Sequence, residues 1–257
     1  MIIKNINIEV QKLINSDKFY ISKKLIIKKK DNYWSPKKDP DGKIRFRLTD
    51  IERKKFISNN KGLIKDIKNL KPKNILDIGC GGGFLLSAFN PKKYKLYGIE
   101  NDFEAINFAK KYGKIIRHDL SKSFSSNTKF DLIIANQVVE HMKKPESLIQ
   151  IVKKNLKKDG KFIIGTPDFD CLMARFYKKN FRMLHDKTHI SLFSRESLIR
   201  FLNKNGFEIF KIDYPYFETE YFKDYKKNTL ANLFDNNKKI SPPFYGNIMN
   251  IYTRLKR

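Results

Sequence analysis

The chain has little cysteine, no long apolar run and only half as many acidic as basic residues. Its two cysteines, Cys80 and Cys171, are far apart and fit no metal-ligand spacing, which favours a reducing compartment. No apolar stretch approaches the roughly 18 residues that a membrane-spanning helix needs. The first residues lack a long apolar core and include the acidic Glu9 and Asp17, so we expect no signal peptide. These absences predict a cytoplasmic protein without a transmembrane segment.

The shortage of acidic residues leaves a formal net charge of +27, from 54 Lys and Arg against 27 Asp and Glu. Such a charge can attract nucleic acid, an anionic membrane or a phosphorylated substrate. It can also reflect AT-rich coding sequence, because the chain is rich in Lys, Asn and Ile. The lysines are scattered, and no Arg-rich or aromatic-interleaved block occurs. We therefore interpret the charge as compositional and expect no specific nucleic-acid partner.

Four of the twelve glycines gather in one segment, at 74–84. A short apolar run, Ile75 to Ile78, predicts a buried strand, and the apolar stretch from Phe84 to Phe89 predicts the start of a helix. Between them lies a turn with four glycines, at positions 79, 81, 82 and 83. A strand, a glycine-rich turn and a helix together form a nucleotide-binding corner, since glycines let the backbone approach a ligand closely.

The spacing within this corner indicates which nucleotide it binds. The third glycine of a dinucleotide fingerprint would fall on Phe84 or Leu86, and a P-loop would need Gly-Lys-Ser/Thr, so both of these motifs fail. Residues 77–83 read Asp-Ile-Gly-Cys-Gly-Gly-Gly. This run resembles the first motif of the class I S-adenosylmethionine (SAM)-dependent methyltransferases, D-x-G-x-G-x-G. The resemblance implies an enzyme that uses SAM as its cofactor.

The same resemblance assigns further cofactor residues downstream. Glu100 follows the glycines by about the spacing of a ribose-binding acid, and the family would use it for the ribose hydroxyls, with Asn101 beside it. Asp119 matches the position that contacts the adenine amino group. The segment from Asn136 to His141 resembles the fourth motif, which lies under the methionine part of SAM. The implied cofactor-binding residues are Asp77, Gly79, Cys80, Gly81, Gly83, Glu100, Asn101, Asp119, Leu120, Asn136 and Gln137.

Strand-like and helical segments alternate through this region, which predicts an α/β, Rossmann-like fold with helices on both faces of a mostly parallel sheet. By resemblance the last of seven strands runs antiparallel, inserted between the fifth and the sixth. The expected strands are 75–78, 95–99, 115–117, 130–135, 161–165, 207–214 and 247–255, and the expected helices include 145–156 and 195–205.

We divide the chain into an N-terminal cap at 1–70 and a SAM-binding domain at 71–257 with an insertion at about 166–194. One helix is expected from Thr49 and Asp50 to about Leu70. In related enzymes the N-terminal segment covers the cofactor and shapes the acceptor site. Tyr33 and Trp34 either stack on the acceptor there or pack the cap onto the core.

Candidate catalytic residues come from the histidines, because an oxygen or nitrogen acceptor profits from a general base near neutral pH. His185 and His189 lie in a block at 184–194 that resembles small-molecule methyltransferases related to the ubiquinone-pathway O-methyltransferases. Asp186 is spaced to orient an imidazole, and His141 follows the fourth motif. For each of these four residues the alternative is a structural role without a part in catalysis. We expect no metal site, since three close ligands cannot be placed.

The expected acceptor is a small molecule methylated at oxygen. Similarity to methyltransferases of surface-polysaccharide biosynthesis suggests a sugar or glycan precursor, and the aromatic residues at 214–217 and 221–222 either form an acceptor wall or pack under the cap. An RNA methyltransferase is the alternative that the charge favours. The base-methylating motif with two prolines is missing at 136–139, and the similar stretch at 241–244 lies too far downstream. A SAM-binding protein without catalysis is the third alternative.

Overall fold

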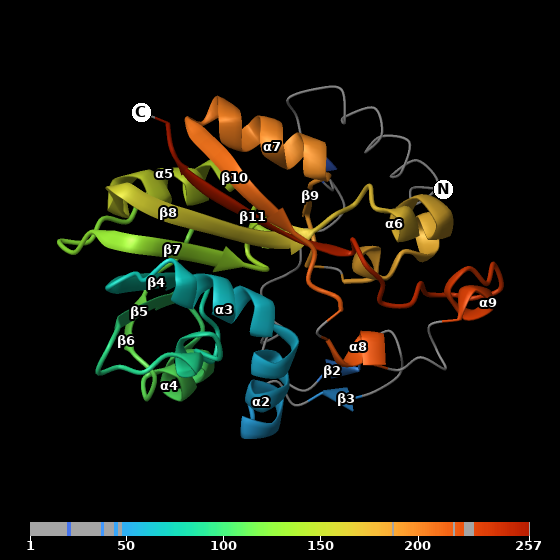
Figure 1. The fold of residues 1–257 in the computed structure, drawn as a ribbon, viewed down its shortest axis with the longest axis horizontal. Coiled ribbons are helices and arrows are strands. Elements are labelled where there is room, and N and C mark those ends of the chain that lie inside the picture. The colour runs from blue at the N-terminus through green and yellow to red at the C-terminus, as the bar shows by residue number, and fades with distance from the viewer. Residues whose placement is uncertain are drawn as a thin grey trace.

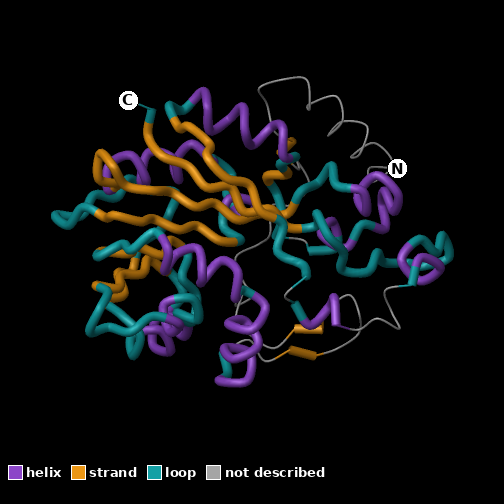
Figure 2. Tube along the Cα trace, viewed as in Figure 1, coloured by secondary structure: helices purple, strands orange, loops and turns teal. Residues whose placement is uncertain are grey.

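A computed structural model describes residues 20–21, 37–38, 44–45, 48–186, 188–217, 219–223 and 229–256. Its centre is a seven-stranded sheet with the order β10-β11-β8-β7-β4-β5-β6, shown in Figures 1 and 2. These strands are β4 (Asn74–Ile78), β5 (Lys95–Glu100), β6 (Lys114–Arg117), β7 (Phe130–Asn136), β8 (Leu156–Pro167), β10 (Phe207–Asp213) and β11 (Ile248–Leu255). Strands β4 to β8 run parallel, whereas β11 is antiparallel to both β8 and β10. The predicted fold, including the inserted last strand, is confirmed.

Helices cover both faces of the sheet, which explains why its central strands are apolar along their whole length. On one face Leu76, Ile133 and Phe162 pack with the buried residues of α5 (Pro145–Asn155) and α7 (Arg195–Lys204). On the other face Ile75, Ile134 and Ile163 pack against α3 (Lys61–Asn69). The carboxyl ends of the parallel strands, where ligands collect in such sheets, stay uncovered by these helices.

The cap helix differs from its prediction because it is divided in two. Helix α2 (Asp50–Asn59) ends at Asn60, which has φ −117° and ψ 23° and precedes α3. Only α3 buries an apolar face against the sheet, whereas α2 buries none of its residues. The break lets α2 leave the sheet and extend beside the carboxyl ends of the strands (Figure 1).

The helix expected directly after the glycines is also missing from the described residues. Gly81 and Gly83 both have positive φ, so the chain turns repeatedly there, and only a 3-10 turn, η1 (Leu86–Ala88), follows. Helix α4 (Phe103–Ala109) comes after β5 instead. The corner therefore presents backbone N–H groups from a glycine turn rather than from the first turn of an α-helix.

The insertion after β8 packs with a distant segment around a small core of its own. It holds α6 (Leu172–Tyr177) and the 3-10 turns η3 (Lys178–Asn180) and η4 (Arg182–Leu184), and it meets α9 (Leu230–Leu233). The Tyr177 hydroxyl donates to the Leu233 carbonyl over 2.7 Å. Further short elements are α8 (Glu220–Lys223), β9 (Ser191–Leu192), which pairs with β1 (Tyr20–Ile21), and the pair of β2 (Lys37–Lys38) and β3 (Ile44–Arg45).

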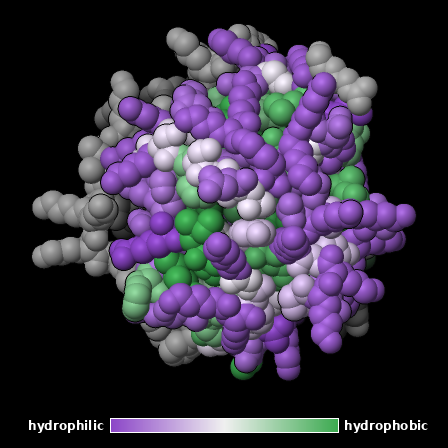
Figure 3. All heavy atoms as spheres, turned by 90° about the vertical axis from the view of Figure 1, so that its left-hand side faces the viewer, coloured by the Kyte–Doolittle hydropathy of each residue, from purple (hydrophilic) through white to green (hydrophobic). Residues whose placement is uncertain are grey.

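The side of the molecule at the amino ends of the parallel strands is mainly hydrophilic, with apolar atoms showing between the polar side chains (Figure 3). Among the described helices none combines the length and the apolar character that a membrane crossing would require.

Candidate active site

A cavity of about 1560 Å³ lies at the carboxyl ends of β4, β5, β6 and β7. Every residue expected to bind the cofactor lines it except Gly83. Helix α2 and Tyr221 contribute to the lining as well. Sequence reasoning named no residue of α2, because this helix has no apolar stripe that would mark it as packed. Its lining residues are Glu52, Lys55, Phe56, Asn59 and, just beyond its end, Asn60.

The glycine turn is shaped by its contacts on both sides. Gly79 and Cys80 donate their backbone N–H groups to the Ile99 carbonyl at 2.8 and 3.0 Å, which ties the turn to β5. A Cβ on Gly79, where φ is +68°, would lie 2.6 Å from a methyl carbon of Val138. A Cβ on Gly83 would lie 3.0 Å from that of Ala109. Gly83 thus serves the packing of the turn against α4, while Gly79 and Gly81 border the cavity.

Glu100 holds this turn from the end of β5. One carboxylate oxygen accepts the Gly81 N–H at 2.9 Å, and the other accepts the N–H groups of Asn101 and Asp102 at 2.7 and 2.9 Å. These bonds fix the carboxylate on the cavity wall. A carboxylate accepts more than one hydrogen bond per oxygen, so it can also receive hydroxyl donors.

Asp77 lies near the carboxyl end of β4. It lines the cavity and is only 4% exposed. Burial, together with the negative charge of Glu100, raises the pKa of Asp77 to about 8. Cys80 next to the turn is buried, and a Cβ on Gly98 would lie 2.5 Å from its sulfur atom, so Cys80 fills the space above β5. Burial also raises the pKa of the Cys80 thiol, as expected for a packed rather than a reactive cysteine.

We expect Asp77→Asn to flatten the pH dependence of stability. An unfolded aspartate has a pKa near 4, so between roughly pH 4 and 8 the folded protein retains a proton that the unfolded chain has lost. The free energy of unfolding therefore falls as pH rises through this window, by up to about 1.4 kcal/mol per pH unit for one group. Urea unfolding between pH 5 and 8 should show a shallower fall in Asp77→Asn. Equal slopes in the variant, the wild type and the exposed control Glu104→Gln would contradict this.

Asp119 and Leu120 lie on the cavity wall beyond β6. One oxygen of Asp119 accepts the Ser121 N–H at 2.9 Å and so shapes the loop. Phe103 at the start of α4 also lines the cavity and is 63% exposed, which leaves an apolar ring at this end. His118 lines the same end, where its ring packs near Phe124 with 5.1 Å between the centroids.

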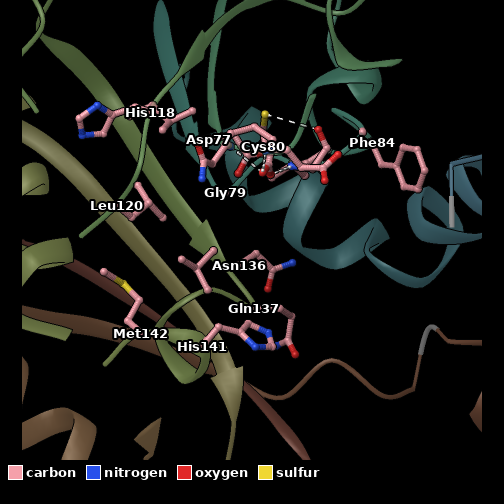
Figure 4. Close-up of a pocket in the computed structure, with 18 of the residues that line it drawn as sticks. Asp77, Gly79, Cys80, Phe84, His118, Leu120, Asn136, Gln137, His141 and Met142 are labelled. Atoms are coloured by element: carbon pink, nitrogen blue, oxygen red, sulfur yellow. Dashed lines mark hydrogen bonds between the residues drawn. The ribbon is translucent and has the colours of Figure 1, made fainter. Parts of the chain in front are cut away.

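Asn136 ends β7 and Gln137 follows it, and both line the cavity between the glycine turn and His141 (Figure 4). Gln137 has φ +58° and donates its backbone N–H to the Gly165 carbonyl at 2.8 Å. A Cβ on Gly165 would lie 2.2 Å from the side-chain oxygen of Asn136, so glycine there makes room for the amide. The side-chain nitrogen of Gln137 is buried and has no hydrogen-bond partner among the described residues. A buried donor on a cavity wall fits a ligand that brings an acceptor.

Of the four proposed catalytic residues only His141, on the 3-10 turn η2 (Val139–His141), lines the cavity. Its Nδ1 lies 3.1 Å from the Thr188 carbonyl, which fixes the proton on Nδ1 because a carbonyl can only accept. Asp186 in turn accepts from the N–H and the hydroxyl of Thr188 at 2.9 and 2.6 Å. Asp186 thus holds the loop that orients His141. Its other carboxylate oxygen lies 3.9 Å from Nε2 of His189, the imidazole that the sequence spacing offers it as a neighbour.

His189 and His185 do not line the cavity. His189 is buried beside His141, with 4.9 Å between the ring centroids, and its Nδ1 lies 2.7 Å from the Met183 carbonyl. His185 is an exposed residue at the end of η4, outside the cavity lining. Burial lowers the pKa of the His189 imidazole. Tyr33 and Trp34 lie outside the described residues, so their expected part in the acceptor site stays a prediction.

Comparison with known proteins agrees with this geometry. A family model described as a methyltransferase domain matches residues 52–212. The chain is 34% identical over 106 residues to a ubiquinone biosynthesis O-methyltransferase of Glaesserella parasuis, which covers 37% of this chain and 45% of that protein. It is 29% identical over 153 residues to an uncharacterized protein of Methanocaldococcus jannaschii, covering 59% and 73%. The chain thus spans less than half the length of the first of these relatives.

Solved structures share the fold. A SAM-dependent methyltransferase of Thermotoga maritima, a possible histamine N-methyltransferase, aligns with a TM-score of 0.55 at 21% identity over 82% of this chain and 97% of that one. Magnesium protoporphyrin IX methyltransferase of Synechocystis, with bound S-adenosylhomocysteine (SAH), gives 0.53 at 15% identity over 84% and 90%. Since the family model spans most of the chain and the fold agrees with it, the chain belongs to the class I SAM-dependent methyltransferases, enzymes whose cofactor is S-adenosylmethionine.

Proposed function

We propose that the protein transfers a methyl group from SAM to an oxygen of a small-molecule acceptor, a sugar or glycan precursor. The observation that carries this proposal is a single cavity that runs from the cofactor residues Glu100 and Asp119 to His141 and Tyr221. One cavity with both sets of residues can hold cofactor and acceptor side by side. The name of the Glaesserella relative supports methylation at oxygen.

In this proposal the cofactor end of the cavity uses the sequence-predicted residues. Glu100 receives the ribose hydroxyls, Asp119 the adenine amino group with Leu120 against the ring, and Asn136 and Gln137 border the methionine part. When bound, SAM supplies a methyl group already activated by the sulfonium charge. The protein therefore has to position the acceptor more than to activate the methyl group.

His141 is the residue that we assign to the acceptor. It helps the acceptor hydroxyl lose its proton, and Asp186, through Thr188, keeps the ring in one tautomer. His189 packs behind this ring and supports it. We assign His185 no part in the reaction, because it is exposed and outside the cavity lining.

An aromatic cluster at the rim of the cavity supports a ring-shaped acceptor. Tyr221 of α8 lines the cavity, and its neighbour Phe222 lies 5.1 Å from Phe217, which lies 5.2 Å from Tyr245, between ring centroids. Phe217 is 58% exposed, so its face is open to a ligand. We propose that the cap at 1–70 and the insertion at about 166–194 enclose this end. The buried free thiols Cys80 and Cys171 support a cytoplasmic setting.

An acceptor screen tests the proposed function. The purified chain is incubated with SAM labelled in the methyl group and, separately, with sugar nucleotides, glycan fragments, phenolic compounds and total RNA. We expect the label in a small-molecule fraction, in a product whose methyl group is attached to oxygen and not to nitrogen. Label that enters RNA alone, at physiological salt, would replace the proposal with the RNA alternative. SAH binding without transfer to any fraction would favour a non-catalytic SAM-binding protein.

A further inference from the structure

Three potential metal ligands meet where the segment after β7 touches the segment before β9. Glu140, His141 and His189 each offer one donor atom, and these atoms all lie within 4.8 Å of one another. The two segments are joined at this point by the Ile190 N–H, which donates to the Glu140 carbonyl at 2.7 Å. The cluster is therefore held by the backbone and does not depend on flexible side chains meeting by chance.

Both imidazoles are oriented in the way that metal-binding histidines commonly are. The Nδ1 atom of His141 lies 3.1 Å from the Thr188 carbonyl, and that of His189 lies 2.7 Å from the Met183 carbonyl. Each carbonyl keeps the ring proton on Nδ1, which places the lone pair on Nε2. Metal-binding histidines usually donate their second ring N–H to a carbonyl or carboxylate in this manner.

Glu140 supplies a buried carboxylate that, in the described part of the chain, lacks a hydrogen bond at one of its two oxygen atoms. Its side chain is fully buried, and one oxygen accepts from the Thr166 hydroxyl at 3.1 Å. The other oxygen has no hydrogen-bond partner among the described residues. Buried carboxylates are normally paired with a cation or coordinate a metal.

We infer that Glu140, His141 and His189 bind one transition-metal ion of the Zn²⁺ type. Two imidazoles and one carboxylate are a ligand set suited to zinc and its neighbours, whereas Mg²⁺ and Ca²⁺ prefer oxygen ligands alone. Asp186 adds negative charge, since its second oxygen lies 3.9 Å from His189 Nε2. The sequence offered only His185, Asp186 and His189 as neighbours, so the contribution of the 140–141 pair could not be foreseen.

The position of the ion gives it a use in the reaction. His141 lines the cavity, so an ion on its ring lies next to the acceptor end, and three protein ligands leave a coordination position for an oxygen. This part of the inference rests on the proposed function, and it makes His141 act on the acceptor through the ion, because an Nε2 lone pair that binds a metal does not accept a proton. An acceptor hydroxyl that binds the ion loses its proton to solvent more readily, because the positive charge stabilises the alkoxide.

Metal binding is tested without any acceptor, so its result does not depend on the proposed function. The full chain, free of any histidine tag and treated with EDTA, is titrated with Zn²⁺ and, separately, Mg²⁺ by calorimetry, and with Co²⁺ by visible absorption. We expect one Zn²⁺ or Co²⁺ per chain and no comparable Mg²⁺ binding. Glu140→Gln and His189→Gln should weaken Zn²⁺ binding on the order of 100-fold, while both still bind SAH. His185→Gln, a histidine nearby outside the cluster, should leave it unchanged.

Several outcomes would overturn the inference. A wild-type chain that takes up no Zn²⁺ or Co²⁺ would do so directly, whether or not the variants fold. If Glu140→Gln binds Zn²⁺ as tightly as the wild type, the ion is held by other residues. The same conclusion follows if His185→Gln loses as much Zn²⁺ affinity as the cluster variants. Mg²⁺ bound as tightly as Zn²⁺ would contradict the imidazole ligands. Metal binding with no methyl transfer in the acceptor screen would leave the site standing and remove the proposed function.

Discussion

Replacing His141 by asparagine is expected to lower turnover by roughly 10²–10⁴-fold and to leave SAH affinity nearly unchanged. Asparagine can still donate a side-chain N–H toward the Thr188 carbonyl, which His141 now contacts through Nδ1 at 3.1 Å. The substitution removes the second ring nitrogen, the one that acts on the acceptor. Initial rates with the acceptor found in the screen, and calorimetry with SAH, measure the two effects separately.

His185→Gln is the matched comparison for this experiment. His185 belongs to the sequence block that suggested a catalytic histidine, yet it is exposed and does not line the cavity. We expect its replacement to change turnover less than threefold, on the order of ordinary surface substitutions. Full turnover in His141→Asn would end the assignment of His141, and a large loss in His185→Gln would return the catalytic role to the block at 184–194.

Removing the carboxylate of Glu100 is expected to weaken SAH binding by about 1–3 kcal/mol, or roughly 5- to 150-fold. Glu100→Ala takes away the acceptor for the backbone N–H groups of Gly81, Asn101 and Asp102 as well as the proposed partner of the ribose. Gly81→Val should act in the same direction, because Gly81 has φ +52° and lines the cavity. Calorimetric titration with SAH measures both variants.

Glu104→Ala serves as the control for Glu100, since it removes an exposed carboxylate from the first turn of α4. It should bind SAH like the wild type. Normal affinity in both Glu100→Ala and Gly81→Val would show that the cofactor lies elsewhere. Loss of affinity in all three variants would indicate an effect of net charge rather than of the glycine turn.

The sheet could be predicted because its signal is local. Buried parallel strands such as β4 and β7 must be apolar along their length, and Ile75 or Ile133 report this without knowledge of their neighbours. The residues expected to bind the cofactor follow a local rule as well, because Asp77, Glu100 and Asp119 all stand at or near the end of a strand. Each such end reaches the same edge of the sheet.

The features that escaped prediction depend on contacts between distant residues. The cap helix breaks where Asn59, Asn60 and Gly62 weaken it, but these residues do not show that α3 packs on the sheet while α2 lies beside the cavity. In the same way, the neighbour of His141 is His189, far along the chain, and only the packing of η2 against the loop before β9 brings them to 4.9 Å. Sequence spacing suggested pairs within the block at 184–194, whereas the fold brings His189 of that block next to His141.

The place of β11 within the sheet imposes an order on folding. This strand pairs with β8 through Ile251 and Ile164 and with β10 through Ile251 and Ile212, so two earlier strands meet only through the segment at 248–255. Until that segment emerges from the ribosome, β8 and β10 each carry an unpaired edge of apolar residues, the kind of surface that recruits other strands. Closing the sheet also spans a long stretch of chain, which slows the step. A nascent chain of this protein is therefore open to aggregation through these edges until the segment at 248–255 has emerged and paired.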